Sequence, residues 1–142
     1  MEKNFFKKKI LPFLSVALIA VIALAGCSGE TPEGTPVGGV VSIGEGGTVF
    51  RFEKIDEELN LFEWDVHTNE ATVGAALLEV GLIAGDVHDW GLMVTSVNGV
   101  TADFNDGGAW WRFNIDGEMS MYGVTATYIE AGRTYTFVFA RG

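Results

Sequence analysis

The chain has 142 residues, of which 48% are hydrophobic, and it carries a net charge of −10 at pH 7. This acidity argues against a nucleic-acid-binding role, because the phosphate backbone would repel the protein. The sequence contains a single cysteine, which excludes an internal disulfide bond.

The first 26 residues have the pattern of a secretory signal peptide. Four lysines precede an apolar run at 10–25, which is shorter than the roughly 20 residues that a membrane-spanning helix needs. The run ends in Leu24-Ala25-Gly26-Cys27, the bacterial lipobox pattern. We therefore expect cleavage before Cys27 and acylation of its sulfur and its freed amine. Two or more acyl chains, palmitate among them, would anchor the protein to the extracytoplasmic face of the cell membrane.

The segment at 28–47 reads SGETPEGTPVGGVVSIGEGG. It cannot bury enough apolar surface to fold alone, so the sequence predicts a flexible linker. We assign residues 1–26 to the signal peptide, 27–48 to the lipidated cysteine and linker, and 49–142 to one domain. The signal holds four of the 9 basic and one of the 19 acidic residues, so cleavage leaves a net charge of 5 − 18 = −13. This charge should keep the domain away from an anionic lipid surface.

Within the domain, alternating apolar and polar residues predict two strands at 48–56 and 61–68, joined by an acidic turn. Thr72 can cap a short helix whose apolar residues recur at helical spacing through Val80, with Gly81 and Gly85 as candidate stops. Further strands are predicted at 93–97, 110–115 and 134–139, and the first two are followed by the turn dipeptides Asn98-Gly99 and Asp116-Gly117. The order β-β-α-β-β-β predicts an α+β domain with one helix packed across a mostly antiparallel sheet.

Alternation in the tryptophan strand divides its side chains between two faces. Trp111, Phe113 and Ile115 share a face apolar enough to be core, while Trp110, Arg112 and Asn114 share the other. After the next turn, a loop carries Met119, Met121 and Tyr122. Ordinary sheet packing is one interpretation of these large side chains. The other is a rim for a large, flat, amphipathic ligand, formed by Trp110, Arg112, Met119, Met121 and Tyr122.

The sequence contains no readable catalytic set, and we predict that the protein is not an enzyme. It has neither a G-x-S-x-G motif nor a glycine-rich phosphate loop in a strand-to-helix context. The segment DFNDG at 103–107 lacks the spacing of a calcium loop, so a solvated acidic turn is the better interpretation. His88 follows Asp86 and precedes Asp89, which would give at most a weak metal site, and we assign no metal ligand.

Four segments together carry a resemblance to a known family: TVGAALLEVGLI at 72–83, GLMVTSVNGV at 91–100, WWRFNIDGE at 110–118, and YGVTATYIEAGRTYTFVF at 122–139. Over about 69–142 they resemble the transcobalamin-like C-terminal domain, a β-rich module of vertebrate cobalamin carriers. The module also occurs in bacterial surface lipoproteins as DUF4430. The matching positions are Gly91 with Thr95-Ser96-Val97, Trp110-Trp111, and Met121-Tyr122-Gly123-Val124 with Tyr128 and Gly132.

The resemblance implies a β-grasp-like topology and a ligand-facing edge made by the loop at 119–122 with Trp110 or Arg112. It implies cobalamin or another corrinoid as ligand. In the carriers an α-helical barrel supplies most other contacts, and we expect no barrel in this chain, so a partner protein would complete the site. Two alternatives stay open: a cell-surface adhesion or protein-interaction module, and a weak metal-ion binder that uses its acidic loops.

Overall fold

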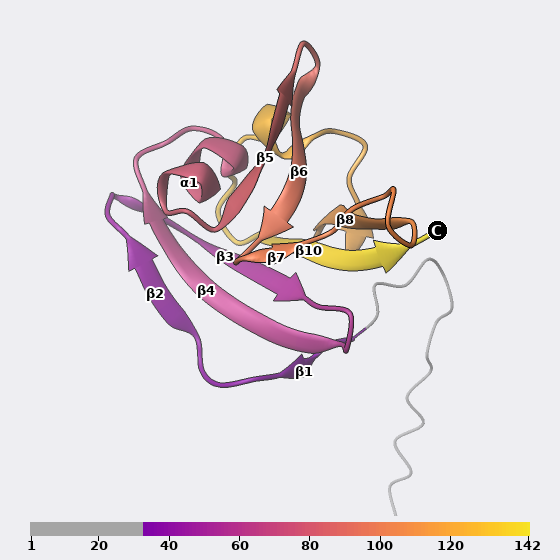
Figure 1. Ribbon diagram of the computed structural model, residues 1–142. Helices are drawn as coiled ribbons and strands as arrows, with labels where there is room; N and C mark the ends of the chain where they lie inside the picture. The colour runs from indigo at the N-terminus through magenta and orange to yellow at the C-terminus, as the bar shows by residue number, and fades with distance from the viewer. Residues whose placement is uncertain (1–32) are drawn as a thin grey trace, which may run out of the picture.

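Two β-sheets and one short α-helix make up the part of the chain that the computed structural model describes, residues 33–142. The main sheet has the order β1-β4-β3-β10-β8-β9, with β2 also paired to β4, and a separate sheet has the order β5-β6-β7 (Figure 1). The elements in chain order are β1 (Thr35–Pro36), β2 (Val41–Gly44), β3 (Thr48–Ile55), β4 (Asn60–Thr68), α1 (Val73–Glu79), β5 (Ile83–His88), β6 (Gly91–Val97), β7 (Val100–Thr101), β8 (Ala109–Ile115), β9 (Glu118–Met119), the 3₁₀ turn η1 (Val124–Ala126) and β10 (Thr134–Arg141).

The centre of the main sheet is a parallel pair, β3 and β10. β3 also pairs antiparallel with β4, and β10 pairs antiparallel with β8. The β3–β4 turn is held by Asp56, whose Oδ1 accepts hydrogen bonds from the backbone N–H of Glu58 and of Asn60, both at 2.9 Å. β10, the last strand in sequence, lies between β3 and β8, and its residues from Tyr135 to Val138 are buried.

Helix α1 begins at the predicted cap. Thr72 Oγ1 accepts a hydrogen bond from the backbone N–H of Ala75 at 3.2 Å, which satisfies a donor that the first helical turn leaves free. Val73, Ala76 and Leu77 are buried against the sheet, as their helical spacing predicts. The helix ends before Gly81, which has a φ of 74° and so lies in the left-handed region that glycine tolerates.

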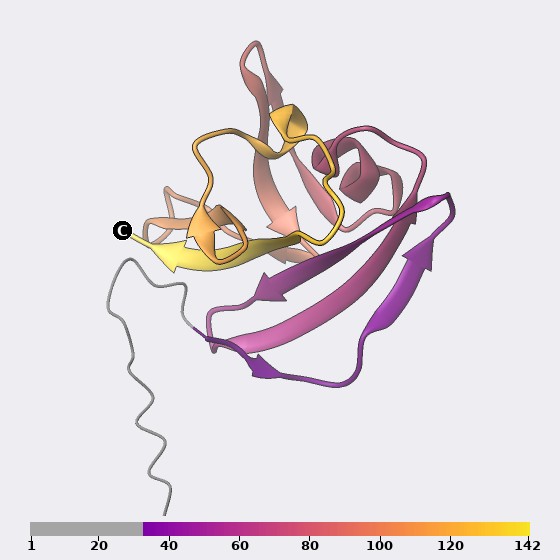
Figure 2. The ribbon, with the colours of Figure 1, turned by 180° about the vertical axis from the view of Figure 1, so that it is seen from behind.

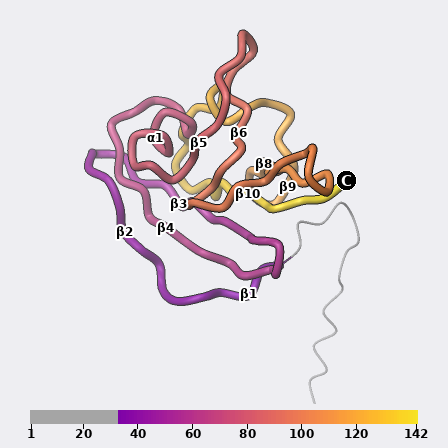
Figure 3. The backbone as a smooth tube through the Cα atoms, in the orientation of Figure 1, coloured from indigo at the N-terminus to yellow at the C-terminus, as the bar shows by residue number. Residues whose placement is uncertain are grey.

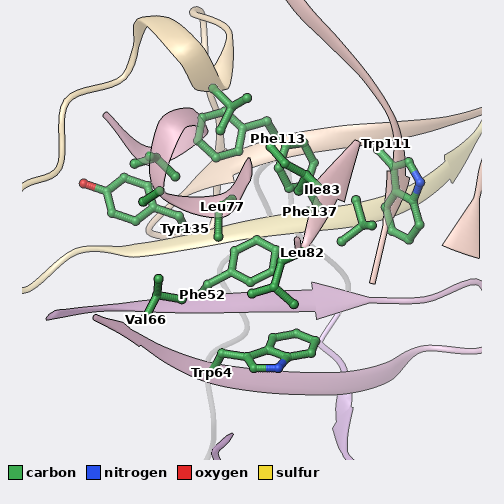
Figure 4. Packing of buried hydrophobic residues seen from close by; sticks show 14 of the residues in the cluster. Phe52, Trp64, Val66, Leu77, Leu82, Ile83, Trp111, Phe113, Tyr135 and Phe137 are labelled. Atoms are coloured by element: carbon green, nitrogen blue, oxygen red, sulfur yellow. The ribbon is translucent and has the colours of Figure 1, made fainter. Parts of the chain in front are cut away.

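The hydrophobic core lies between the main sheet and the layer formed by α1, β5 and β6. Aromatic rings dominate it: Phe113 packs at 5.1 Å from Phe137, and Phe52 lies 5.5 Å from Trp64, measured between ring centroids. Figure 4 shows Leu77, Leu82 and Ile83 pointing into the same cluster. The mostly-β fold with one helix confirms the predicted α+β class.

The second sheet differs from the expectation of one sheet. Strand β6 pairs with β5 and β7 rather than joining the main sheet. Strand β5 was not predicted, because Gly85 within it was interpreted as a residue that ends the helix. Gly85 instead lies at a β-bulge, where a Cβ atom would stand 1.9 Å from the carbonyl oxygen of Met93. Strand pairing at this distance requires glycine. In Figure 3 the β5–β6 hairpin extends away from the rest of the domain.

The linker expectation also needs correction. Residues 35–36 and 41–44, which we predicted to be flexible, form β1 and β2 and pair in parallel with the two ends of β4. Ser42 Oγ lies 2.9 Å from Nε2 of His67, which adds a side-chain bond to the β2 pairing. Figure 3 traces both short strands along the outer edge of β4. The folded domain therefore begins before residue 49. Cys27 and the predicted signal peptide lie outside the described residues.

Candidate functional site

Two hollows lie beside strand β8, on the side where the β5–β6 hairpin approaches it. One has a volume of about 350 Å³ and is bounded by β6, β8 and residues 101–105. The other, of about 270 Å³, is bounded by β6, β8 and the start of η1 at Gly123 and Val124. Both are lined by Met93, Val94 and Trp110. We call the two hollows together the β6–β8 cleft. The larger hollow has a volume within the range of small-molecule sites, and the surface that lines both hollows is mostly apolar.

Large apolar side chains are exposed around this cleft. Trp90 lines the smaller hollow with 67% of its surface exposed, and Phe104 lines the larger one with 68% exposed. At the hairpin turn, the His88 ring stacks on Trp90 with ring centroids 4.9 Å apart. Seen from behind in Figure 2, the segment that carries η1 runs beside this hairpin. Gly123 and Val124 of that segment line the smaller hollow. Exposed aromatic rings gathered at a hollow are typical of a binding surface.

The two neighbouring tryptophans of β8 have different environments, as strand alternation predicts. Trp111 is 6% exposed, packs edge-on against Phe139 at 5.3 Å, and donates from Nε1 to the carbonyl oxygen of Val100 at 3.1 Å. This bond ties β8 to β7 and so joins the two sheets. Trp110 is 39% exposed and contributes to the cleft. Trp111 is therefore structural, while Trp110 is available to a ligand.

The predicted rim residues lie on β8, on β9 and in the loop after β9. Trp110 lines both hollows, whereas Arg112, Met119, Met121 and Tyr122 line neither of them. The loop residues are nevertheless exposed, and Met121 is the most open at 88%. Ser120 Oγ donates to the carbonyl oxygen of Tyr122 at 2.9 Å and accepts from its N–H at 3.1 Å, which fixes the turn of this loop. The next two residues, Gly123 and Val124, line the smaller hollow.

Arg112 lies on the face of β8 turned away from the core, which we call the second face. Its Nε atom is buried and has no hydrogen-bond partner. Met119 lies on the same face, since it pairs with Asn114 across the β8–β9 turn. The second face is more covered than alternation predicts, because Asn114, Thr136 and Val138 are also buried there.

Farther along the second face, charged side chains are paired. Arg51 donates to Asp65 at 2.9 Å and to Glu63 at 3.0 Å. Thr136 Oγ1 donates to Glu53 at 3.0 Å. Burial raises the pKa of the Glu53 carboxyl, and the bond from Thr136 only partly offsets this effect. These pairs stabilise the sheet rather than forming an open site.

Neither histidine is placed in a metal cluster. His67 contacts Ser42 and His88 stacks on Trp90. Across residues 33–142, no group of three or more His, Cys, Asp or Glu side chains is arranged to hold a metal ion. In the same residues, no helix combines the length and the apolar character needed to span a bilayer.

Sequence reasoning missed Trp90, Met93 and Phe104 as parts of the candidate site. For Trp90 and Phe104 the available signal was a polar setting: Trp90 follows Asp89 and precedes Gly91, and Phe104 lies within the acidic turn. A large apolar residue inside a polar turn has no strand or helix face on which to be buried. Their grouping around one cleft depends on the unpredicted strand β5, which brings the hairpin to β8.

Comparison with known families decides the family of this chain. The model of a domain of unknown function, DUF4430, matches residues 69–141. The chain belongs to the DUF4430 family. The family resemblance drawn from the sequence is thereby confirmed, and the matched range includes α1, both sides of the β6–β8 cleft and β10.

Solved structures share the fold of this DUF4430 chain. A crystal structure of a Ruminococcus gnavus ATCC 29149 protein, described provisionally as metal binding, is 21% identical with a TM-score of 0.63, and the match covers 68% of this chain and 99% of that one. Haptocorrin in complex with Cbi is 16% identical with a TM-score of 0.51, over 66% of this chain and 25% of haptocorrin. At these identities the likeness establishes the fold. No curated protein matches the chain.

Proposed function

We propose that this DUF4430 protein is a non-catalytic binding module, anchored by lipid on the extracytoplasmic face of the membrane. Its ligand is a flat, largely apolar molecule held at the β6–β8 cleft, and a corrinoid such as cobalamin is the first candidate. The observation that carries the proposal is the position of Trp110, which lines both hollows together with Met93. An exposed indole and a thioether offer apolar area that adapts to a ring system.

The fold relationship supports the choice of ligand class. Haptocorrin binds Cbi, and a quarter of its chain has the fold of this one. The parallel β3–β10 pair inside the order β4-β3-β10-β8 also supports a β-grasp topology for the main sheet, which we propose as its finer description.

A partner protein is part of the proposal, because the cleft is open to solvent. Tight small-molecule sites bury most of the ligand surface, and a one-sided site should bind weakly. We infer that the exposed loop with Met121 and Tyr122 and the hairpin tip with Trp90 contact either the far side of the ligand or the partner that covers it.

Calorimetric titration of the full-length chain in detergent with cobalamin tests this proposal. We expect saturable binding by the wild type and at least about fivefold weaker binding by Trp110→Ala, since aromatic anchors at a binding centre typically contribute about 1 kcal/mol or more. Tyr128→Ala is the matched control, because Tyr128 is exposed and lines neither hollow. Absence of binding by the wild type, or equal losses in the two variants, would contradict the proposal. Recovery of unchanged cobalamin after incubation checks the non-catalytic role.

The hairpin tip favours a second candidate, a cell-surface protein-interaction module. Val87 and Trp90 are both largely exposed at the tip, even though the His88 ring stacks on Trp90. Such side chains become buried when a protein partner docks. For this function, Val87→Ser with Trp90→Ser would abolish retention of a protein partner in pull-downs from the cell surface, whereas cobalamin would have no effect on retention.

A further inference from the structure

Arg112 stands apart from the other cations of this acidic domain. Residues 33–142 contain five basic side chains, and each of the other four has a contact: Arg51 with Glu63 and Asp65, Arg133 with Asp116 and Glu130, Arg141 with Glu57, and Lys54 with the ring of Phe62, 4.3 Å from Nζ. In the described chain, Arg112 takes part in no ion pair, and its buried Nε has no acceptor. A buried donor without a partner is costly, so it normally has a reason.

The strand positions next to Arg112 carry no charged side chain. Val138 lies directly opposite it on β10, and Trp110 and Asn114 flank it along β8. Met119 lies beyond Asn114 on β9. None of these four side chains is charged. The carboxylate of Glu53, on the same face of β3, already accepts a bond from Thr136.

We infer that Arg112 binds an anionic oxygen group, a carboxylate or a phosphate, on a ligand whose apolar part lies against Trp110 and Met119. A guanidinium presents a fork of N–H donors that matches both groups, and its bonds to them are charge-assisted. Trp110 is the link to the β6–β8 cleft, because it lines the hollows and also belongs to the second face. The inference rests on the proposed function in one respect: it names the polar chemistry of the ligand at the same edge.

Small aromatic probes test the inference without a corrinoid, so it can fail or succeed separately from the proposed function. The full-length chain in detergent, labelled with ¹⁵N, is titrated with 1-naphthoate, with 1-naphthyl phosphate and with the neutral 1-naphthamide. The signals followed are the Arg112 Nε–H and the Trp110 indole N–H. We expect both signals to move with the two anions, and at least one anion to bind about tenfold more tightly than the amide. The tighter of the two anions identifies the group as carboxylate or phosphate.

Variants separate a ligand role from a structural one. Arg112→Gln should abolish the preference for anions, while Arg133→Gln should keep it, because Arg133 is exposed and already paired. Arg112→Met should raise the melting temperature of the unliganded protein, since it removes the unpartnered donor from a buried position. Equal binding of anions and amide by the wild type would overturn the inference, even where a variant does not fold. A preference retained by folded Arg112→Gln would overturn it as well.

Discussion

Two adjacent residues of β8, Trp110 and Trp111, have different roles because their environments differ. Trp111 fills the core and holds the carbonyl of Val100, while Trp110 faces solvent at the cleft. We expect Trp111→Ala to lower the free energy of unfolding by roughly 3–5 kcal/mol, as deletion of a large core side chain does. Trp110→Ala should cost far less, because little of its packing is lost. Urea denaturation of both variants measures the difference, and similar losses would mean that the strand alternation is misassigned.

The carboxyl group of Glu53 makes the stability of the folded protein depend on pH. Burial raises its pKa above the ordinary 4.5, against the opposing effects of Thr136 and Arg51 and with a further increase from Glu63. The folded protein therefore binds this proton more tightly than the unfolded chain, and stability from this group is lost as pH rises from about 4.5 through the raised pKa. Glu53→Gln should become progressively more stable relative to the wild type over that pH range. Denaturation curves at several pH values test this, and a constant difference would contradict it.

At the scale of elements, the loop after β9 carries its large side chains without a core beneath them. Met121 and Tyr122 are exposed, so Met121→Ser with Tyr122→Ser should leave the melting temperature nearly unchanged. If these side chains contact the ligand or its partner, the double variant should bind at least tenfold more weakly. Thermal melting and titration together test both parts. A melting loss of the size expected for a core deletion would show that the loop is packed in solution.

The elements that the sequence predicted are those whose pattern is local. The alternation in β3, β4, β8 and β10 and the Thr72 cap with helical spacing are visible in the residues themselves. Strands β1 and β2 were not predictable in this way, because segments of two and four residues become strands only through pairing with β4. Strand β5 was hidden by Gly85, whose role depends on the distant carbonyl of Met93. The β6–β8 cleft could not be predicted from the sequence either, because the hairpin that forms one of its walls contains β5.

For the whole molecule, the pairing of β1 and β2 with β4 places the start of the folded domain near residue 35, close in sequence to Cys27. We propose that acylated Cys27 holds the domain at the membrane through this short connection. Cys27→Ala should release the protein from membranes or leave an uncleaved precursor. Fractionation followed by mass spectrometry of the N-terminus measures both outcomes. A variant that stays with the membrane and is still cleaved before residue 27 would exclude the lipobox.

The central claim, that a ligand binds at the β6–β8 cleft, is tested most directly by the indole N–H spectrum of the four tryptophans. Trp90 and Trp110 are exposed at the cleft, whereas Trp64 is buried in the core and lines neither hollow. When cobalamin is added to the ¹⁵N-labelled protein, we expect saturable shifts of the Trp90 and Trp110 signals and an unchanged Trp64 signal. Stationary Trp90 and Trp110 signals at saturating cobalamin, or shifts equal to that of Trp64, would contradict it.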